Sequence, residues 1–284
     1  MRGGFCVAAK VDLFSTQARH RSGDAANSSR AIAGRLTSKI RVADNTEITR
    51  DTLLRGRVKL CQPRVGFRSS LDPLLLAGFV VPPFGYFLDM GCASGALSFL
   101  LLAHDPAARG IGVEIQPRLA ALAEQGRQDN GFENRFAVVG GDVRSDGVVA
   151  AQAFDLVTTN PPFRPVGTGV LSPLSEKALA NHEVSLALHE WLDVAAKALR
   201  QGGRLATIFP FDRRDELIAG LQARGFQIAR SRLVVPREGE TPNRVLVEAR
   251  RTLTLVETRF EPPLVVHDGA GYSVEMRRML GEDA

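Results

Sequence analysis

A strand, a glycine-bearing turn and a helix follow one another between residues 86 and 102, and this order constrains the fold more than any other feature of the chain. The apolar run 86–90 predicts a buried strand, and residues 96–102 predict a helix. Between them, Gly91 and Gly95 let the backbone turn tightly and approach a ligand with no Cβ in the way. This order is typical of nucleotide pockets in α/β sheets, so it predicts an α/β fold with a ligand site where the strand ends.

Two further strands bring acidic side chains to the same place. The strand predicted at 110–115 contains Glu114 near its end, about twenty residues after the glycine turn, where α/β nucleotide sites carry the acid that accepts from both ribose hydroxyls. The strand predicted at 136–140 is followed by Asp142 and Val143, which we expect to meet an adenine. The three strand ends then line one edge of the sheet.

The rest of the pattern completes one domain. A fourth strand is predicted at 154–158, followed by a helix over 186–199, a strand over 204–209, a helix over 213–224 and strands over 226–235 and 244–249. The last two strands flank a turn that contains glycine and proline, which predicts an antiparallel hairpin. We expect a seven-stranded, mostly parallel sheet with a C-terminal antiparallel hairpin and helices on both faces, formed by residues 46–284.

A second motif, Thr159-Asn160-Pro161-Pro162-Phe163, comes directly after the fourth strand. An aromatic amine is a poor nucleophile because its lone pair is delocalised into the ring. Hydrogen bonds from its N–H groups to the Asn160 side-chain oxygen and the Pro161 carbonyl would concentrate density on nitrogen, and Phe163 would stack on the base, a contact worth roughly 1 to 3 kcal/mol. The motif therefore predicts a clamp for a planar exocyclic amine and favours methylation of an amine nitrogen. The aperiodic stretch 164–181 that follows is long for a connection and predicts a functional loop over the substrate site.

Together these motifs resemble those of the Rossmann-like class I methyltransferases that depend on S-adenosylmethionine, over roughly residues 46 to 284. Their first motif is Asp-x-Gly-x-Gly-x-Gly, and this chain has Ala93 at the middle glycine. We expect the extra methyl group to be tolerated if the backbone there needs no positive φ. The resemblance implies S-adenosyl-L-methionine as the methyl donor and a donor site formed by Asp89, Gly91, Gly95, Glu114, Asp142 and Val143.

The resemblance also implies a role for each acid of this donor site. Asp89 would lie near the methionine part of the donor, Glu114 would hold the ribose and Asp142 would reach the adenine amino group. The sulfonium of the donor is already an activated leaving group, so positioning and electrostatics carry the rate and we expect no metal.

Further segments narrow the resemblance to the tRNA1(Val) adenine-37 N6-methyltransferase family, which methylates the adenine just 3′ of the anticodon. These segments are residues 57–60, 66–77, 167–169, 176–183 and 268–273. The resemblance implies N6 methylation of an adenine in RNA, with tRNA favoured. It assigns catalysis to Asn160, Pro161 and Phe163, and substrate binding to Pro162, Arg164 and Arg68.

Other functions remain as alternatives. Guanine-N2 rRNA methyltransferases share Asn-Pro-Pro-Phe but continue with His where this chain has Arg164. Glutamine N5-methyltransferases of release factors usually have Tyr in place of Phe163 and a folded helical N-terminal domain. DNA adenine methylation would call for a recognition domain that the pattern does not indicate. A catalytically silent RNA-binding module is the non-enzymatic alternative, and binding of S-adenosylmethionine would argue against it.

The charge of the chain is unevenly distributed. The whole chain has 36 Lys and Arg against 31 acids; residues 1–45 hold eight against three, so residues 46–284 carry 28 of each. RNA binding by the domain must therefore rest on a local patch. The candidate arginines and lysine are Arg57, Lys59, Arg64, Arg68, Arg164, Arg230, Arg232, Arg237 and Arg244.

The tail, residues 1–45, is rich in Ser, Ala and Arg and lacks periodicity, which predicts disorder. It fits an RNA-binding arm or an extension with no role, and a transit peptide shares this composition. No run reaches the length of a membrane span, and three cysteines without CxxC spacing indicate neither a disulfide framework nor a zinc site. We expect a cytoplasmic protein, with an organelle as the alternative if the tail is a transit peptide, and a monomer.

Overall fold

The computed structural model describes residues 48–161 and 186–282, which belong to one compact unit formed by residues 42–284. The tail 1–45, its predicted disorder and the predicted loop 164–181 lie outside the described residues. So do three residues expected at the substrate site: Pro162, Phe163 and Arg164.

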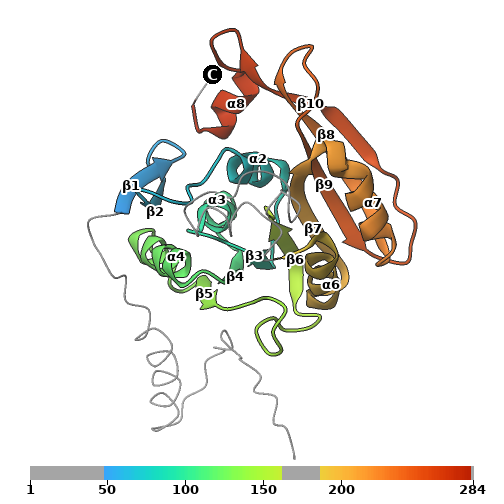
Figure 1. Ribbon diagram of the computed structural model, residues 1–284, viewed down its shortest axis with the longest axis horizontal. Coiled ribbons are helices and arrows are strands. Elements are labelled where there is room, and N and C mark those ends of the chain that lie inside the picture. The colour runs from blue at the N-terminus through green and yellow to red at the C-terminus, as the bar shows by residue number, and fades with distance from the viewer. Residues whose placement is uncertain (1–47, 162–185, 283–284) are drawn as a thin grey trace, which may run out of the picture. The chain divides into compact units, whose positions relative to one another are not determined.

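A nine-stranded sheet with the order β11-β10-β8-β9-β7-β6-β3-β4-β5 forms the centre of the described unit (Figure 1). The strands are β3 (Tyr86–Met90), β4 (Arg109–Glu114), β5 (Phe136–Gly140), β6 (Phe154–Thr159), β7 (Leu199–Pro210), β8 (Phe226–Arg237), β9 (Arg244–Arg251), β10 (Arg259–Asp268) and β11 (Gly271–Tyr272). Strands β5, β4, β3, β6 and β7 are parallel, and β9 is antiparallel to both β7 and β8. The seven predicted strands are therefore confirmed as β3 to β9, including the antiparallel hairpin of β8 and β9.

The two additional strands continue the sheet beyond β8. Strand β10 runs parallel to β8, and its register shifts between Glu261 and Leu264, where Pro262 and Pro263 interrupt the pairing. A proline has no N–H to give to a ladder, so it breaks the alternation that identifies a strand in a sequence. Strand β11 pairs with β10 over only two residues. These features explain why the sequence pattern predicts seven strands rather than nine.

Helices cover both faces of the sheet, as predicted. On one face lie α2 (Asp72–Phe79), α3 (Ala96–His104) and the short α8 (Val274–Met279), which share a core with Phe87 of β3. On the other face lie α6 (Leu188–Ala198) and α7 (Arg214–Gln222), which share a second core with Leu88. Helix α4 (Pro117–Asp129) packs beside α3, and a 3-10 turn, Phe211–Arg213, precedes α7.

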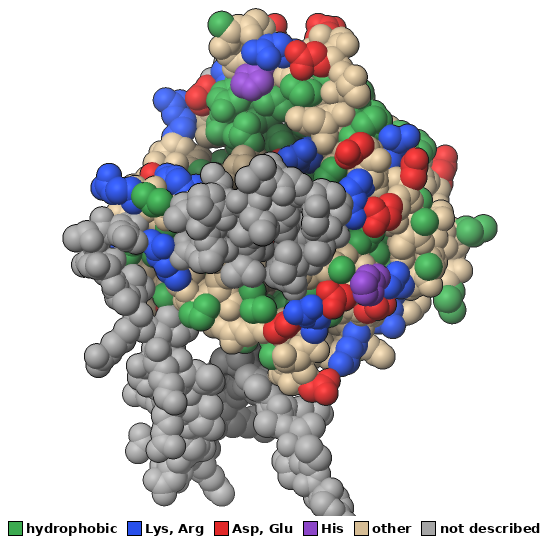
Figure 2. Space-filling view, in the orientation of Figure 1, with side chains coloured by type: hydrophobic (Ala, Val, Ile, Leu, Met, Phe, Trp, Pro, Cys, Tyr) green, Lys and Arg blue, Asp and Glu red, His purple; other side chains and the backbone are tan. Residues whose placement is uncertain are grey.

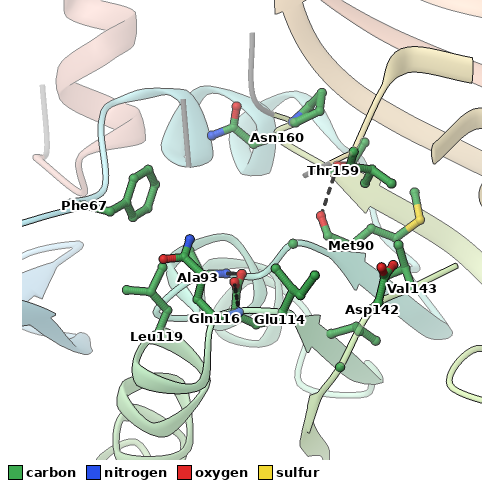
Figure 3. Close-up of a pocket in the computed structure, with 16 residues that line it drawn as sticks. Phe67, Met90, Ala93, Glu114, Gln116, Leu119, Asp142, Val143, Thr159 and Asn160 are labelled. Carbon is green, nitrogen blue, oxygen red and sulfur yellow. Dashed lines mark hydrogen bonds between the residues drawn. The ribbon is translucent and has the colours of Figure 1, made fainter. Parts of the chain in front are cut away.

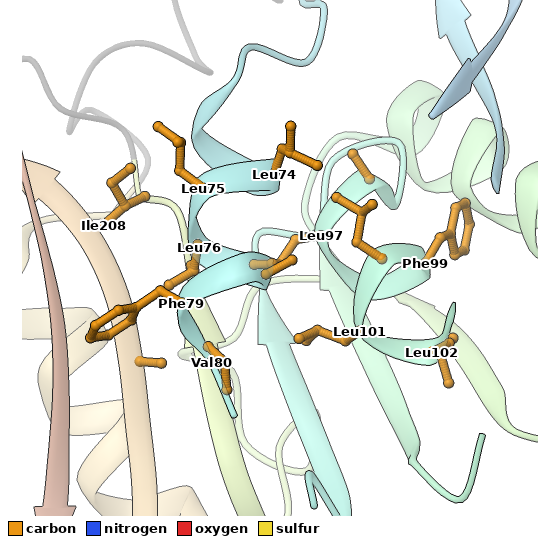
Figure 4. Packing of buried hydrophobic residues seen from close by; sticks show 14 of the residues in the cluster. Leu74, Leu75, Leu76, Phe79, Val80, Leu97, Phe99, Leu101, Leu102 and Ile208 are labelled. Carbon is orange, nitrogen blue, oxygen red and sulfur yellow. The ribbon is translucent and has the colours of Figure 1, made fainter. Parts of the chain in front are cut away.

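Packing between α2 and α3 is dense and apolar (Figure 4). Leu76, Phe79 and Leu101 are no more than 2% exposed, and Leu97 is 4% exposed. Each such side chain contributes about 1.5 to 3 kcal/mol when it leaves water. This core holds the start of α3, and with it the glycine turn that precedes α3, against the sheet.

A separate two-stranded sheet stands beside α4. Strands β1 (Ile48–Leu53) and β2 (Val58–Pro63) pair antiparallel, and the backbone of Lys59 in β2 exchanges two hydrogen bonds with the side chain of Asn130 just after α4, at 2.8 and 2.7 Å. From β2 the chain passes through residues 64–71 into α2. Among the described helices, none is long and apolar enough to cross a bilayer.

Candidate active site

The register of the central strands brings the predicted motifs together at one edge of the sheet. Met90 at the end of β3 is paired with Val113 of β4 on one side and with Thr159 of β6 on the other. The residues that follow these strands therefore emerge next to one another. Two adjoining cavities lie at this edge, and Figure 3 shows the residues around the first, with Asn160 and Glu114 on opposite sides of it.

The glycine turn, residues 91–95, connects β3 to α3. The N–H groups of Gly91 and Cys92 donate to the carbonyl of Val113 at 2.9 and 3.1 Å, which ties the turn to β4. Gly95 has φ +92°, and a Cβ there would lie 2.5 Å from the ring of Phe99, so both the conformation and the packing require glycine.

Ala93 does not satisfy the condition under which its methyl group was expected to be tolerated. Its φ is +49°, so the backbone at the middle position of the motif is left-handed, the region that favours glycine. The side chain lines both cavities, and its N–H donates to the Glu114 carboxylate at 2.9 Å. The turn therefore keeps the conformation that the glycine motif encodes, at the cost of some backbone strain.

Glu114 is held for hydrogen bonding at the cavity wall. Its Oε2 accepts from the N–H of Ala93, and its Oε1 accepts from the N–H of Gln116 at 2.8 Å. Glu114 is 5% exposed, and this burial raises the pKa of the carboxyl despite hydrogen bonds from backbone N–H groups. A carboxylate has about four lone-pair sites, so acceptor capacity remains for a hydroxyl group of a ligand.

Asp89 lies under the turn and is almost fully enclosed. Its Oδ2 accepts from the Ser98 hydroxyl at 2.6 Å, and the hydroxyl of Thr158 lies 3.4 Å from Oδ1. Burial raises the pKa of Asp89 to about 7. The residue borders the second cavity, where the donor's methionine part was expected.

Asp142 and Val143 follow β5 and line the first cavity. Arg144 occupies the Asp142 carboxylate: its Nε and Nη2 donate at 2.9 and 2.6 Å, and these hydrogen bonds lower the pKa of Asp142. The same guanidinium donates to Glu190 at the start of α6 at 2.8 Å. Asp142 thus presents a firmly positioned, ionised carboxylate at the cavity.

Asn160 and Pro161 leave the end of β6 and line the first cavity together. The hydroxyl of Thr159, just before them, donates to the carbonyl of Met90 at 3.0 Å and fixes this exit to β3. The Asn160 side-chain oxygen is buried and finds no donor within the described residues. Leaving a buried acceptor unsatisfied costs about 1 to 3 kcal/mol, and Asn160 lines both cavities.

Arg68, predicted to bind substrate, uses its guanidinium within the N-terminal hairpin. Its Nη1 donates to the Thr49 hydroxyl and the Pro63 carbonyl at 2.7 and 2.9 Å, and its Nη2 donates to Asp51 at 2.7 Å. These bonds fix the segment in which Phe67 lies, and Phe67 borders both cavities.

The structure adds lining residues that the motifs do not indicate. Besides Phe67 these include Met90, Gln116, Leu119 and Leu186. Thr159, the first residue of the motif 159–163, also lines the first cavity. Phe67 lies in the loop between β2 and α2, and the tertiary fold places this loop beside the site. No periodicity in the sequence indicates that position.

Two arginines of the predicted basic patch are paired with acids. Arg230 and Arg232, predicted to contribute to a basic patch, lie 3.1 and 2.6 Å from Glu261 and Glu275, and their side chains are only 14 and 12% exposed. In Figure 2, basic and acidic side chains are mixed on the right of the view, whereas several Lys and Arg side chains with few acidic neighbours lie on the left. Within the described part of the chain, no three His, Cys, Asp or Glu side chains form a group that could hold a metal ion.

The strand order, the glycine turn and the acid after the second parallel strand define a Rossmann-like methyltransferase that depends on S-adenosylmethionine. The methyltransferase small-domain model matches residues 71–212, and the chain belongs to this family.

Known relatives agree with this assignment. The chain is 31% identical over 227 residues to the tRNA1(Val) (adenine(37)-N6)-methyltransferase of Porphyromonas gingivalis, covering 76% of this chain and 88% of the relative. It is 28% identical over 225 residues to the enzyme of the same name from Haemophilus influenzae, covering 78% and 93%. These matches confirm the resemblance seen in the motifs.

Among solved structures, a predicted O-methyltransferase from Agrobacterium tumefaciens superimposes with a TM-score of 0.59 at 21% identity, over 75% of this chain and 98% of that one. This likeness confirms the predicted class of fold.

Proposed function

We propose that the protein transfers a methyl group from S-adenosylmethionine to N6 of an adenine in RNA, and that the RNA is a tRNA methylated 3′ of its anticodon. The observation that carries this proposal is the buried, unsatisfied oxygen of Asn160 at the strand edge that also holds Glu114 and the glycine turn. The relatives named above, whose names specify adenine N6 in a tRNA, support the choice of substrate.

The residues present fit the donor. Glu114 keeps acceptor capacity at the cavity for the ribose hydroxyls, and Asp142, whose carboxylate Arg144 holds in place, lines the same cavity. A Cβ on Gly91 would meet no atom within 4 Å, so that backbone lies open to a ligand. When bound, S-adenosylmethionine supplies a methyl group on a positively charged sulfur that is already a good leaving group.

The protein's own contribution is to hold and polarise the target amine. Asn160 Oδ1 and the Pro161 carbonyl accept the two N–H groups of the adenine, which concentrates electron density on N6 and orients its lone pair. The hydrogen bond to Asn160 replaces the missing partner of a buried acceptor, so binding of an amine is favoured over binding of a group with no N–H. Phe163, outside the described residues, would stack on the base. The second N6 proton is released to water.

The first experiment tests reaction and substrate together. The protein is incubated with radiolabelled S-adenosylmethionine and total RNA from a strain that lacks it, and the labelled nucleosides are identified by mass spectrometry. We expect N6-methyladenosine in the tRNA fraction. Label in N2-methylguanosine would favour the rRNA guanine alternative, and binding of the donor without label in RNA would favour a protein or DNA substrate.

The role of Asn160 has its own test. We expect Asn160→Ala to bind S-adenosylmethionine with unchanged Kd but to lose at least about 100-fold in kcat, the scale seen when one preorganised polar group of an active site is removed. Single-turnover methylation of tRNA and calorimetric donor binding measure the two quantities. The matched control is Gln125→Ala on α4, whose amide donates to Asp129 on the same helix and which should keep full activity. Unchanged turnover of Asn160→Ala would sink the role proposed for this residue.

A further inference from the structure

Four residues are shared by the two cavities at the sheet edge: Phe67, Gly91, Ala93 and Asn160. Glu114 and Asp142 line only the first cavity, whereas Asp89 lines only the second. The shared residues therefore mark the junction between a part of the site that suits a nucleoside and a part that suits another group.

The chemistry of the donor identifies what lies at this junction. S-adenosylmethionine is a nucleoside joined to an amino acid through a positively charged sulfonium. With the nucleoside beside Glu114 and Asp142 and the amino acid in the second cavity, the sulfur is at the junction. Asn160 borders the same junction, as it must if its bound amine is to receive the methyl group.

Phe67 is the aromatic side chain among the four junction residues. The π-face of an aromatic ring carries partial negative charge and attracts a cation within about 6 Å of the ring centre. We propose that Phe67 faces the sulfonium and makes the site prefer the charged donor over S-adenosylhomocysteine, its neutral product. The inference rests on the proposed function, because it needs the donor in these two cavities.

The ring is held in place before any ligand binds. Arg68 anchors the segment on one side through Thr49, Asp51 and Pro63. The N–H of Ser69 donates to the Gln62 side chain at 2.7 Å.

The Gln62 amide in turn donates to Asp51 at 2.7 Å, which closes the network. Phe67 itself packs against the small apolar cluster of Cys61, Leu119 and Leu122. Because this arrangement is already formed, little ordering cost reduces the gain on binding.

The test compares three ligands on one protein. Titration calorimetry measures Kd for S-adenosylmethionine, for S-adenosylhomocysteine and for sinefungin, which carries a protonated amine in place of the methylated sulfonium. In Phe67→Leu we expect Kd for the two charged ligands to rise about two- to thirtyfold, the range of one cation–π contact, while Kd for the neutral product changes much less. Phe67→Tyr keeps an aromatic face and should keep the wild-type preference.

The ratio of the Kd values on the same sample is independent of how much of a variant is correctly folded, so partial misfolding does not mimic the effect. Phe260→Leu, which alters a ring that is 79% exposed on β10, is the matched control and should leave all three constants unchanged. An equal loss of affinity for all three ligands in Phe67→Leu would show that the ring only packs against the ligand and would overturn the inference. A wild-type protein that binds none of them would instead overturn the proposed donor site.

Discussion

At the scale of single residues, Ala93 shows how the chain departs from its motif while keeping the geometry. A left-handed conformation costs an L-residue about 1 to 2 kcal/mol that glycine does not incur, and Ala93 has φ +49°. A glycine at this position would also make the unfolded chain more flexible, which lowers stability by about 0.4 to 1 kcal/mol. Because the strain that is relieved is larger than this loss, we expect Ala93→Gly to raise the free energy of unfolding by up to about 1 kcal/mol in urea titrations.

The control for this prediction is Ala219→Gly, at an exposed position within α7 where the backbone is helical. There the same substitution should lower the free energy of unfolding by about 1 kcal/mol. If both variants lose stability to the same extent, Ala93 is not strained.

Asp89 makes stability depend on pH. Burial raises its pKa to about 7 in the native protein, whereas an aspartate in an unfolded chain titrates near 4. Between about pH 4 and 7 the native carboxyl keeps a proton that the unfolded chain has released, so its contribution to stability falls as pH rises through this window and stays low above it. Asp89→Asn lacks this dependence.

The measurement is the free energy of unfolding of wild type minus that of Asp89→Asn. We expect this difference to decrease from pH 4 to pH 7 and to level off near pH 8. Asp146→Asn, the same substitution at a fully exposed side chain, serves as control. A curve for Asp89→Asn that does not differ from the control curve would contradict the raised pKa of Asp89.

The position of the polar candidate residues at one edge of the sheet could be predicted, because each lies at or just after the end of a strand. Glu114 ends β4, Asp142 comes just after β5 and Asn160 just after β6, and parallel strands deliver their ends to one edge. The hydrogen-bond partners of Arg68 could not be predicted in this way. Thr49 and Asp51 lie in the hairpin of β1 and β2, which is separate from the nine-stranded sheet. Which side chain an arginine meets depends on tertiary folding, and its position in the sequence carries no signal of that partner.

At the scale of elements, a buried ion cluster joins the C-terminal strands. Glu248 of β9 is 3% exposed and lies 3.4 Å from Arg204 of β7 and 4.0 Å from Arg230 of β8. Arg204 also donates to the carbonyls of Val81 and Pro83 ahead of β3. The cluster thus links β7, β8 and β9 to one another and to the segment that precedes β3.

When one charged side chain of a buried cluster is removed, the opposite charges of its partners stay buried without a counter-charge. We expect Glu248→Leu to lower the free energy of unfolding by about 3 to 5 kcal/mol, measured by urea unfolding, with a matching drop in Tm by calorimetry. Glu240→Leu is the matched control: its partner Arg237 is 4.0 Å away and both side chains are about half exposed, so the loss should stay within about 1 kcal/mol. A loss of similar size in both variants would argue that Glu248 acts through side-chain volume alone.

The bounds of helices and strands were predicted best where the pattern of apolar residues is regular. Strand β3 is buried over nearly its whole length, and its apolar run gives its bounds correctly. Helices α6 and α7 were expected at 186–199 and 213–224 and form at Leu188–Ala198 and Arg214–Gln222, within two residues at each end. Strand β7 begins five residues earlier than expected, because Gly202 and Gly203 lie inside it and glycine normally signals a turn.

At the scale of the whole molecule, the charge balance separates the tail from the rest of the chain. Residues 46–284 carry equal numbers of basic and acidic groups, and several of their arginines are paired with acids in the structure. The excess of five positive charges belongs to residues 1–45. Non-specific attraction to RNA phosphates is set by basic groups that are free to release counterions, so we expect the tail to supply most of it.

The salt dependence of RNA binding tests this expectation in the full-length chain. The variant replaces the eight basic residues of the tail by Gln: Arg2, Lys10, Arg19, Arg21, Arg30, Arg35, Lys39 and Arg41. With single-stranded RNA each phosphate contact contributes about −0.7 to the slope of log K against log salt, so the loss of eight basic groups should reduce the slope by up to about 6 units and weaken binding at low salt. The variant's kcat at saturating RNA should not change, because the methyl-transfer site lies in residues 46–284.

A control that replaces Asp12, Asp24 and Asp44 by Asn keeps every basic group and should bind at least as tightly as wild type. Identical slopes for the wild type and the Gln variant would show that the tail does not contact RNA, and would leave the arginines of residues 46–284 to supply the attraction.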